Sequence, residues 1–130
     1  MPSQRVYRKI GIAVAVCVIL CIGGLAVLRW QIQSGLDRWC AVAQAAHPHP
    51  GDHVASLLDY VQSDSHTLQD RDHAVWALGQ ARDSRALLVL QAHFTGEQCH
   101  HDSSLCQHEL EKAIKLCKGE TPNLLCIQIP

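Results

Sequence analysis

No segment of this 130-residue sequence alternates apolar and polar residues with the period of two that marks a half-buried β-strand. The sequence also lacks a basic patch, since residues 31–130 hold seven Lys and Arg against twelve Asp and Glu, a formal charge of −5. Such a chain has little with which to displace counterions from a phosphate backbone, so we expect no nucleic-acid partner. No motif indicates a substrate or a cofactor. These absences predict an all-α protein that is not an enzyme and carries no cofactor.

Residues 10–28, IGIAVAVCVILCIGGLAVL, form the longest stretch without a charged residue. As a helix with a rise of 1.5 Å per residue, this stretch would extend roughly 28 Å, close to the hydrocarbon thickness of a bilayer. Tyr7 and Trp30 flank it, and aromatic rings favour the membrane interface. We therefore expect a single-pass membrane protein with a transmembrane helix over residues 10–28.

Positive charge on either side of this stretch predicts its orientation. The Lys and Arg residues near its ends are Arg5, Arg8 and Lys9 before it and Arg29 and Arg38 after it. Cytoplasmic segments are the richer in Lys and Arg, so the excess before the span places residues 1–9 in the cytosol. We expect a protein of the cell inner membrane whose C-terminal domain is periplasmic or extracellular.

A cleaved signal peptide is the alternative for the same stretch. The apolar region of a signal peptide is usually shorter, about 7–15 residues. Gly24 and Ala26 nevertheless supply small residues for a cut before Val27. Mass spectrometry of the mature N-terminus distinguishes the two, because a chain that starts near Val27 has no anchor.

Small residues form a stripe along the predicted transmembrane helix. They are Ala13, Cys17, Cys21 and Gly24, three or four positions apart. Such a stripe lets a second helix approach closely, so one interpretation is a helix partner in the membrane. The other is that small residues are common in membrane helices whatever their contacts.

Beyond the membrane stretch, apolar residues recur with helical spacing between turn signals. This pattern predicts helices over residues 31–46, 53–62, 67–80, 85–94 and roughly 104–118. HPHPG at residues 47–51 ends the first of them, because proline has no amide hydrogen and disfavours helix before it. Asp52, Thr67 and Ser84 are the expected N-terminal caps of the next three. The expected parts are a juxtamembrane helix and linker over residues 29–51, a helical domain over residues 52–119 and a tail over residues 120–130.

Two of the expected helices look like copies of one another. Shifting residues 71–79 by 39 positions places Ala74 on Ala113, Val75 on Ile114 and Leu78 on Cys117. A period near 40 residues is typical of an α-solenoid built from helical hairpins.

The segment DHAVWALGQARDSRALLVLQAHF, residues 72–94, resembles a HEAT-like repeat. The chain is also similar to small bacterial proteins that have one membrane helix and a HEAT-like domain. This resemblance implies a short HEAT-like α-solenoid domain that binds another protein, as a scaffold or accessory component of a membrane complex. Only about two repeats fit in the chain where three or more are usual, so caps, cross-links or a partner must complete the array.

The stretch EQCHHDSSLCQHELEKAIKLC, residues 97–117, holds three cysteines and three histidines. Cys106 and Cys117 are eleven residues apart, which in a helix is three turns along one face and about 16 Å along the axis. Each sulfur that ligates zinc lies about 2.3 Å from it, so one metal ion cannot hold both. The stretch therefore does not form a single site.

Cys99 and Cys106 are the first disulfide candidates, because a short loop brings them together and an extracytoplasmic compartment favours oxidation. Cys117 has Cys126 or Cys40 as its candidate partner, and the odd number of cysteines outside the span leaves at least one either unpaired or bonded to another molecule. Free thiols are one alternative. Another is a metal-binding or thiol-redox protein that uses the residues Cys99, His101 and Cys106, with His100 and Asp102 as further ligands.

The remaining histidines offer a weaker signal. His47, His49 and His53 lie in or beside the proline-rich linker, where they form either a weak transition-metal site or part of a solvated connection. Histidines that titrate near pH 6.5 also suggest docking that changes as an outer compartment acidifies. Partner affinity that stays flat from about pH 5 to 8 would dismiss that hypothesis.

Overall fold

The computed structural model describes residues 4–100 and 102–120 of the chain. Within these residues it contains five α-helices, one 3₁₀ helix and no strand, so the all-α prediction is confirmed for the described part. Predictions that concern residues 1–3, His101 and the tail after residue 120, including Cys126, lie outside the described residues.

The chain divides into two compact units, residues 1–34 and 35–130. Helix α1, Gln4–Ala46, contributes its first part to one unit and its last part to the other. Side chains from Val6 to Ser34 are exposed, among them Ile19 and Leu20 at 67% and 69%. Over the described residues, α1 is the one helix long and apolar enough to cross a membrane.

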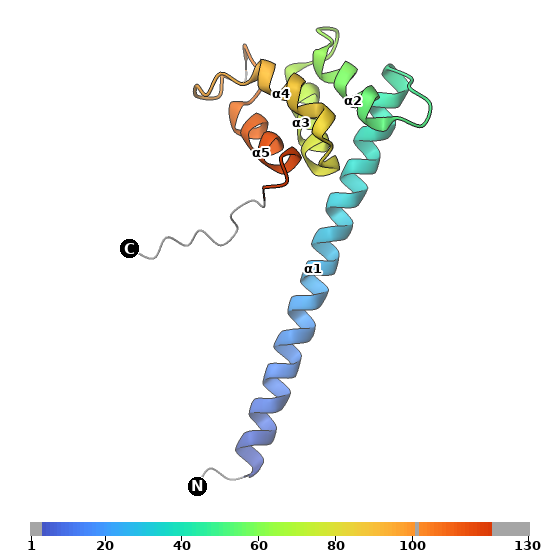
Figure 1. Ribbon diagram of the computed structural model, residues 1–130. Helices are drawn as coiled ribbons and strands as arrows, with labels where there is room; N and C mark the ends of the chain where they lie inside the picture. The colour runs from blue at the N-terminus through green and yellow to red at the C-terminus, as the bar shows by residue number, and fades with distance from the viewer. Residues whose placement is uncertain (1–3, 101, 121–130) are drawn as a thin grey trace. The chain divides into compact units, whose positions relative to one another are not determined.

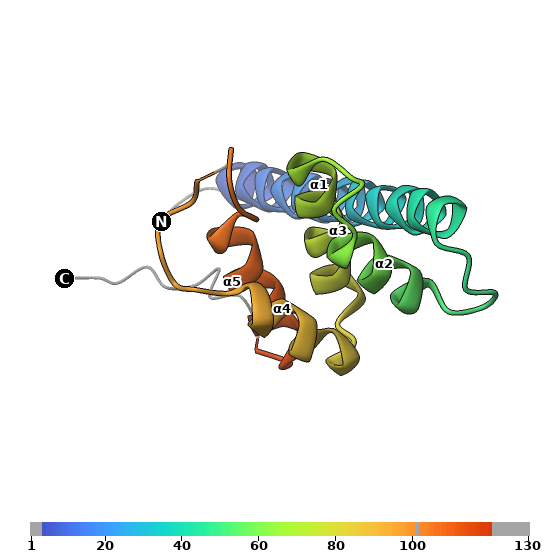
Figure 2. The same ribbon diagram turned by 90° about the horizontal axis from the view of Figure 1, so that it is seen from above.

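The second unit contains the end of α1 and all the later helices. These are α2, His53–Gln62; α3, Leu68–Ala81; the 3₁₀ helix η1, Ser84–Ala86; α4, Leu87–His93; and α5, Gln107–Cys117. Helix α3 packs against α2 and against α5, and α4 also packs against α5 (Figure 1). Figure 2 shows the same order from above, with α3 lying between α2 and α5.

Two of the four predicted helix starts agree with the observed ones. The side chains of Asp52 and Thr67 accept the backbone N–H groups of Ala55 and Asp70, as N-terminal caps do. The prediction that Ser84 caps the next helix is wrong. Asp83 takes that role by accepting the N–H of Arg85, and the chain then makes a 3₁₀ turn before α4. The last helix starts three residues later than expected, at Gln107.

One apolar core joins these helices. Its largest fully buried side chains are Leu57, Val61, Val75, Leu78, Leu90 and Leu110. The residues that the 39-residue shift sets in register are all buried, with Ala74 at 0% and Ala113 at 2% exposed. The periodicity therefore identified core positions correctly on both α3 and α5.

Helices α3 and α5 approach each other closely at Gly79. A Cβ atom at this position would lie 2.9 Å from the Cα and 3.0 Å from the Cβ of Ala113. Atoms that close overlap, and one of them belongs to backbone that cannot rotate away. The absence of a side chain at Gly79 is therefore what allows the two helices to pack at this distance.

Two buried polar side chains hold the connections between helices. Arg71 donates through Nε to the carbonyl oxygen of Val61 at 2.7 Å and through Nη1 to Asp64 at 2.9 Å, fixing the end of α2. Gln107 connects the end of α4 to the start of α5. Its Oε1 accepts the N–H groups of Thr95 and Gly96, and its Nε2 donates to the carbonyl oxygens of His93 and Leu105.

Arg85 links two carboxylates on the surface of the domain. Its guanidinium lies 2.7 Å from Asp52 and 2.9 Å from Asp83. The hydrogen bond from Arg85 lowers the pKa of Asp52 from 3.8 to about 2, and it also lowers the pKa of Asp83. A carboxyl whose pKa is lower in the folded state stabilises the fold above its unfolded pKa and loses that contribution as the pH falls through its folded value.

We therefore expect the pair to stabilise the domain above about pH 4, and the stabilisation to disappear as the pH falls towards about 2. Arg85→Gln should lower the midpoint of urea unfolding at about pH 6 and have little effect near pH 2. Urea titrations of both proteins across this range, with Trp fluorescence as the readout, measure the difference. An equal difference in urea midpoint at about pH 6 and near pH 2 would contradict the stabilising role of this ion pair. Added salt should reduce the difference at about pH 6, because the pair is exposed.

Candidate functional site

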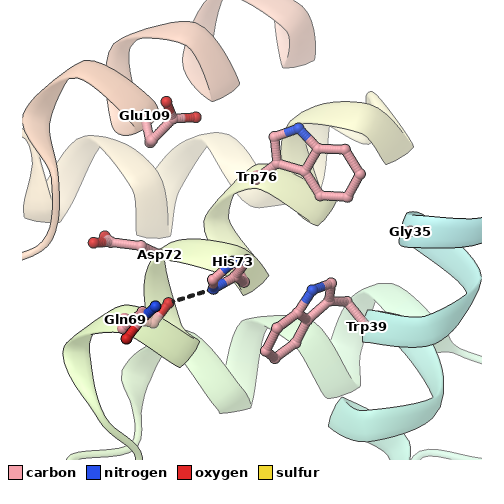
Figure 3. A pocket seen from close by; sticks show the side chains of 7 residues that line it. All are labelled: Gly35, Trp39, Gln69, Asp72, His73, Trp76 and Glu109. Atoms are coloured by element: carbon pink, nitrogen blue, oxygen red, sulfur yellow. Dashed lines mark hydrogen bonds between the residues drawn. The ribbon is translucent and has the colours of Figure 1, made fainter. Parts of the chain in front are cut away.

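A hollow of about 460 Å³ opens on the second unit, with mostly apolar walls. This volume is within the usual range for sites that bind small ligands or single side chains. Its lining residues come from three helices: Gly35 and Trp39 from α1, Gln69, Asp72, His73 and Trp76 from α3, and Glu109 from α5. Figure 3 shows the indole rings of Trp39 and Trp76 on one side of the hollow and the carboxylates of Asp72 and Glu109 on the other.

Trp39 is held in place by two aromatic neighbours. The ring of His73 stacks on it with centroids 4.8 Å apart, and Tyr60 meets it edge to face at 6.4 Å. His73 is itself oriented, because its Nδ1 donates to the carbonyl oxygen of Gln69 at 2.7 Å (Figure 3). One face of Trp39 is therefore covered, and the ring serves as a fixed wall.

Trp76 forms the second aromatic wall, and Gly35 leaves the room for it. A Cβ on Gly35 would lie 3.1 Å from Cη2 of Trp76, closer than side chains normally approach. Trp76 is half-buried, so part of its ring remains open to the hollow. An exposed indole beside fixed polar groups is typical of residues that contribute strongly to binding.

The charged groups of the pocket wall are both acidic. Asp72 accepts the backbone N–H of Cys106 at 2.8 Å, which fixes its carboxylate at the start of α5. Glu109 accepts from Lys112 at 3.2 Å, an exposed pair of the kind that contributes little to stability. No Lys or Arg is among the described residues that line the hollow, so this part of its wall has an acidic character.

A pair of thiols lies at the start of α5. The Sγ atoms of Cys99 and Cys106 are 2.8 Å apart, which is too long for the 2.05 Å of a disulfide bond and places the two thiols in contact. Cys106 occupies the position before the first residue of α5, and Cys99 Sγ accepts the backbone N–H of His108 at 3.3 Å. The helix start thus directs a backbone N–H at the Cys99 sulfur.

These contacts shift the pKa values of the two thiols in opposite directions. The hydrogen bond from the Cys106 thiol, with the N–H of His108, lowers the pKa of Cys99 below its ordinary value. Burial raises the pKa of Cys106, and the hydrogen bond to Cys99 adds to that rise. Cys99 is therefore the thiol that ionises first and the more reactive of the two, because the thiolate is the nucleophile in thiol exchange.

The other predicted cysteines are placed apart from this pair. Cys117 is buried, and its Sγ donates to the carbonyl oxygen of Leu78 at 3.5 Å. Burial raises the pKa of both Cys117 and Cys40. The predicted partner Cys126 lies outside the described residues, so that pairing stays a prediction.

The structure gives the linker histidines separate partners. His47 and His66 share a hydrogen bond between their Nε2 atoms at 3.0 Å, and His49 lies 2.6 Å from Asp59. His53 is exposed at the start of α2. Among the described residues, no group of three or more His, Cys, Asp or Glu side chains is placed to hold a metal ion. His101 is outside that set, so the predicted ligands Cys99, His101 and Cys106 are only partly described.

No protein-family model, no curated protein and no solved structure matches this chain.

The tryptophan pocket was not predicted from the sequence. Trp39 and Trp76 are 37 residues apart, and a tryptophan in a helical pattern indicates only that part of its helix is buried. The signal that was present is the local one on α3, where Asp72 and Trp76 lie four residues apart and so on one face. That spacing pairs an acidic and an aromatic group, but it does not reveal the second indole on α1.

Proposed function

We propose that this protein is a single-pass membrane protein whose helical domain binds another protein, with no catalytic activity of its own. The observation that carries the proposal is the pocket of Trp39 and Trp76, a fixed, partly open aromatic surface on the domain that follows the long apolar stretch. Exposed aromatic residues around a hollow are typical of surfaces that receive a partner side chain.

The order of helix contacts supports a HEAT-like arrangement. Helices α2 and α3 pack together, α4 and α5 pack together, and α3 packs against α5. Stacked hairpins of an α-solenoid make contacts in this order. Two hairpins leave an array with open ends, and a protein partner would complete it.

The proposed location is the inner membrane, with the helical domain on the periplasmic or extracellular side. Support comes from the length of the apolar stretch and from the excess of Lys and Arg before it. A signal sequence near an N-terminus also forms a long apolar helix, so the N-terminus of the mature chain decides between the two. Detection of the peptide from residues 1–9 in the membrane fraction is the expected result.

Co-purification of the full chain in a mild detergent, after cross-linking in cells, tests the proposed function. We expect one protein in constant ratio with the chain. A matched control replaces residues 10–28 with a leucine helix of equal length, which keeps the anchor but removes the small-residue stripe. Retention of the partner assigns the contact to the domain, whereas its loss from the control assigns it to the membrane helix. A chain that brings down no protein in constant ratio would overturn the proposal.

A thiol-redox role is the second candidate, and the contact between the sulfurs of Cys99 and Cys106 favours it. Thiol exchange with an external protein disulfide would convert these two thiols to a disulfide and reduce the external disulfide to two thiols. Such a bond would also staple the loop before α5, as expected for an extracytoplasmic domain. Elemental analysis separates this role from metal binding, because stoichiometric zinc or copper would favour the latter.

We expect that alkylation of the unreduced, denatured protein leaves Cys99 and Cys106 unlabelled and labels Cys40. Peptide mapping after cleavage at Asp102 should then recover residues 99 and 106 in one cross-linked fragment that separates on reduction. In the Cys106→Ser control, Cys99 should be labelled, because its partner sulfur is missing. Complete labelling of both cysteines in the wild-type protein from oxidising cells would exclude the disulfide.

A further inference from the structure

We infer that the pocket of Trp39 and Trp76 selects an arginine side chain from the bound protein. This inference rests on the proposed function and specifies the chemistry of the partner at that site. It follows from three properties of the pocket wall: the open indole, the two carboxylates and the absence of Lys or Arg among the described lining residues.

The first property is the open indole ring of Trp76. A guanidinium group lies flat against an indole face, where the ring quadrupole attracts it and the plane of the group matches the plane of the ring. His73 already covers one face of Trp39 with nearly parallel rings, 13° apart. Trp76 is half-buried and borders the hollow, so it is the ring on which an incoming side chain stacks.

The carboxylates come from two different helices and lie across the hollow from the indoles (Figure 3). Asp72 belongs to α3 and Glu109 to α5, and both border the same space. A guanidinium presents five N–H donors in a rigid fork, so one group can stack on Trp76 and donate to carboxylates at its edge. Asp72 already accepts the N–H of Cys106, and Glu109 pairs with Lys112. An apolar side chain in the same place would remove water from both carboxylates without adding a donor, which costs free energy.

The net charge of the domain also favours an arginine in the pocket. Residues 31–130 carry a formal charge of −5, which attracts a basic partner before contact. Lysine fits less well than arginine, because an ammonium group is more strongly hydrated and has no flat face to stack on the indole. The preference for arginine over lysine is therefore the property that identifies this pocket.

The test uses the indole N–H signals of the ¹⁵N-labelled full chain in an uncharged maltoside detergent. Trp30, Trp39 and Trp76 give three signals, and Trp30 lies outside the pocket, so it serves as an internal control. The probes are three capped tripeptides, Gly-Arg-Gly, Gly-Lys-Gly and Gly-citrulline-Gly, at constant ionic strength. Citrulline has the shape of arginine without its charge.

We expect the arginine peptide to shift Trp76 most and to leave Trp30 unchanged, with weaker shifts from lysine and none from citrulline. Glu109→Gln and Trp76→Leu should each weaken arginine binding by about threefold to tenfold. Asp72→Asn should weaken it too, while Asn keeps the acceptor oxygen for Cys106 N–H. Equal shifts from arginine and citrulline, no shift at Trp76, or unchanged affinity in Glu109→Gln would overturn the inference.

Co-purification with the same variants distinguishes this inference from the proposed function. Loss of the partner from Glu109→Gln and Trp76→Leu, with normal folding by circular dichroism, supports both. A partner that is retained at wild-type level by both variants overturns the arginine contact but leaves the interaction function standing. A wild-type chain that binds the arginine peptide but retains no protein in cells overturns the function alone.

Discussion

Replacing Leu90 with alanine should destabilise the helical domain by about 2–5 kcal/mol, the cost of a cavity at a fully buried leucine. Leu90 is 0% exposed and belongs to α4, a helix of only seven residues whose main neighbour is α5. A helix this short has little stability of its own, so its buried face determines whether it forms. Loss of Leu90 removes the largest fully buried side chain that α4 contributes.

Leu88→Ala is the matched control, because Leu88 lies two residues earlier on the same helix and is 79% exposed. It should change the free energy of unfolding by no more than about 0.5 kcal/mol. Urea unfolding of the full chain in detergent, followed by the fluorescence of Trp39 and Trp76, measures both. Similar losses for the two variants would mean that α4 does not pack through the face that contains Leu90.

A second large loss is expected for Gly79→Val, of about 2–3 kcal/mol. The first added carbon would already lie 2.9 Å from the Cα of Ala113, and valine adds two more. Helix propensity acts in the opposite direction, because valine is a better helix former than glycine by a few tenths of a kcal/mol. A loss of stability therefore measures the overlap between α3 and α5.

The same substitution at Gly24 provides the control, because a Cβ there would meet nothing within 4 Å. Gly24→Val should leave unfolding of the helical domain unchanged. Ala113→Gly in the Gly79→Ala background should restore part of the loss caused by Gly79→Ala alone, since it removes the Cβ at 3.0 Å. The changes in unfolding free energy caused by Gly79→Ala and by Ala113→Gly can be added and compared with that of the double variant. Agreement within about 0.5 kcal/mol would show that the two positions do not touch.

The sequence predicted the helices well where local chemistry determines them. Asp52 and Thr67 cap the helices that they were expected to cap, and HPHPG ends α1 at Ala46. The error at Ser84 has a local cause, because two adjacent residues can both cap and Asp83 also pairs with Arg85. The late start of α5 reflects the capping position of Cys106, whose N–H is taken by Asp72 from α3. That contact spans 34 residues, and no local pattern contains it.

The candidate site depends on tertiary structure more than the helix ends do. Cys99 and Cys106 were expected to meet because only six residues separate them, and the structure places them in contact. The pocket could not be predicted in the same way. Its walls come from α1, α3 and α5, and which face of α1 meets α3 depends on packing around Gly35 and Trp76.

The four hydrogen bonds of Gln107 have a consequence for the timing of local opening. Thr95 and Gly96 lie outside any helix and are exposed, and such amides usually exchange with solvent deuterium within seconds to minutes. Here both N–H groups are held by the oxygen of a side chain that is 5% exposed and belongs to α5. They should therefore exchange on the timescale on which the start of α5 detaches, so that two loop amides report the opening of that helix.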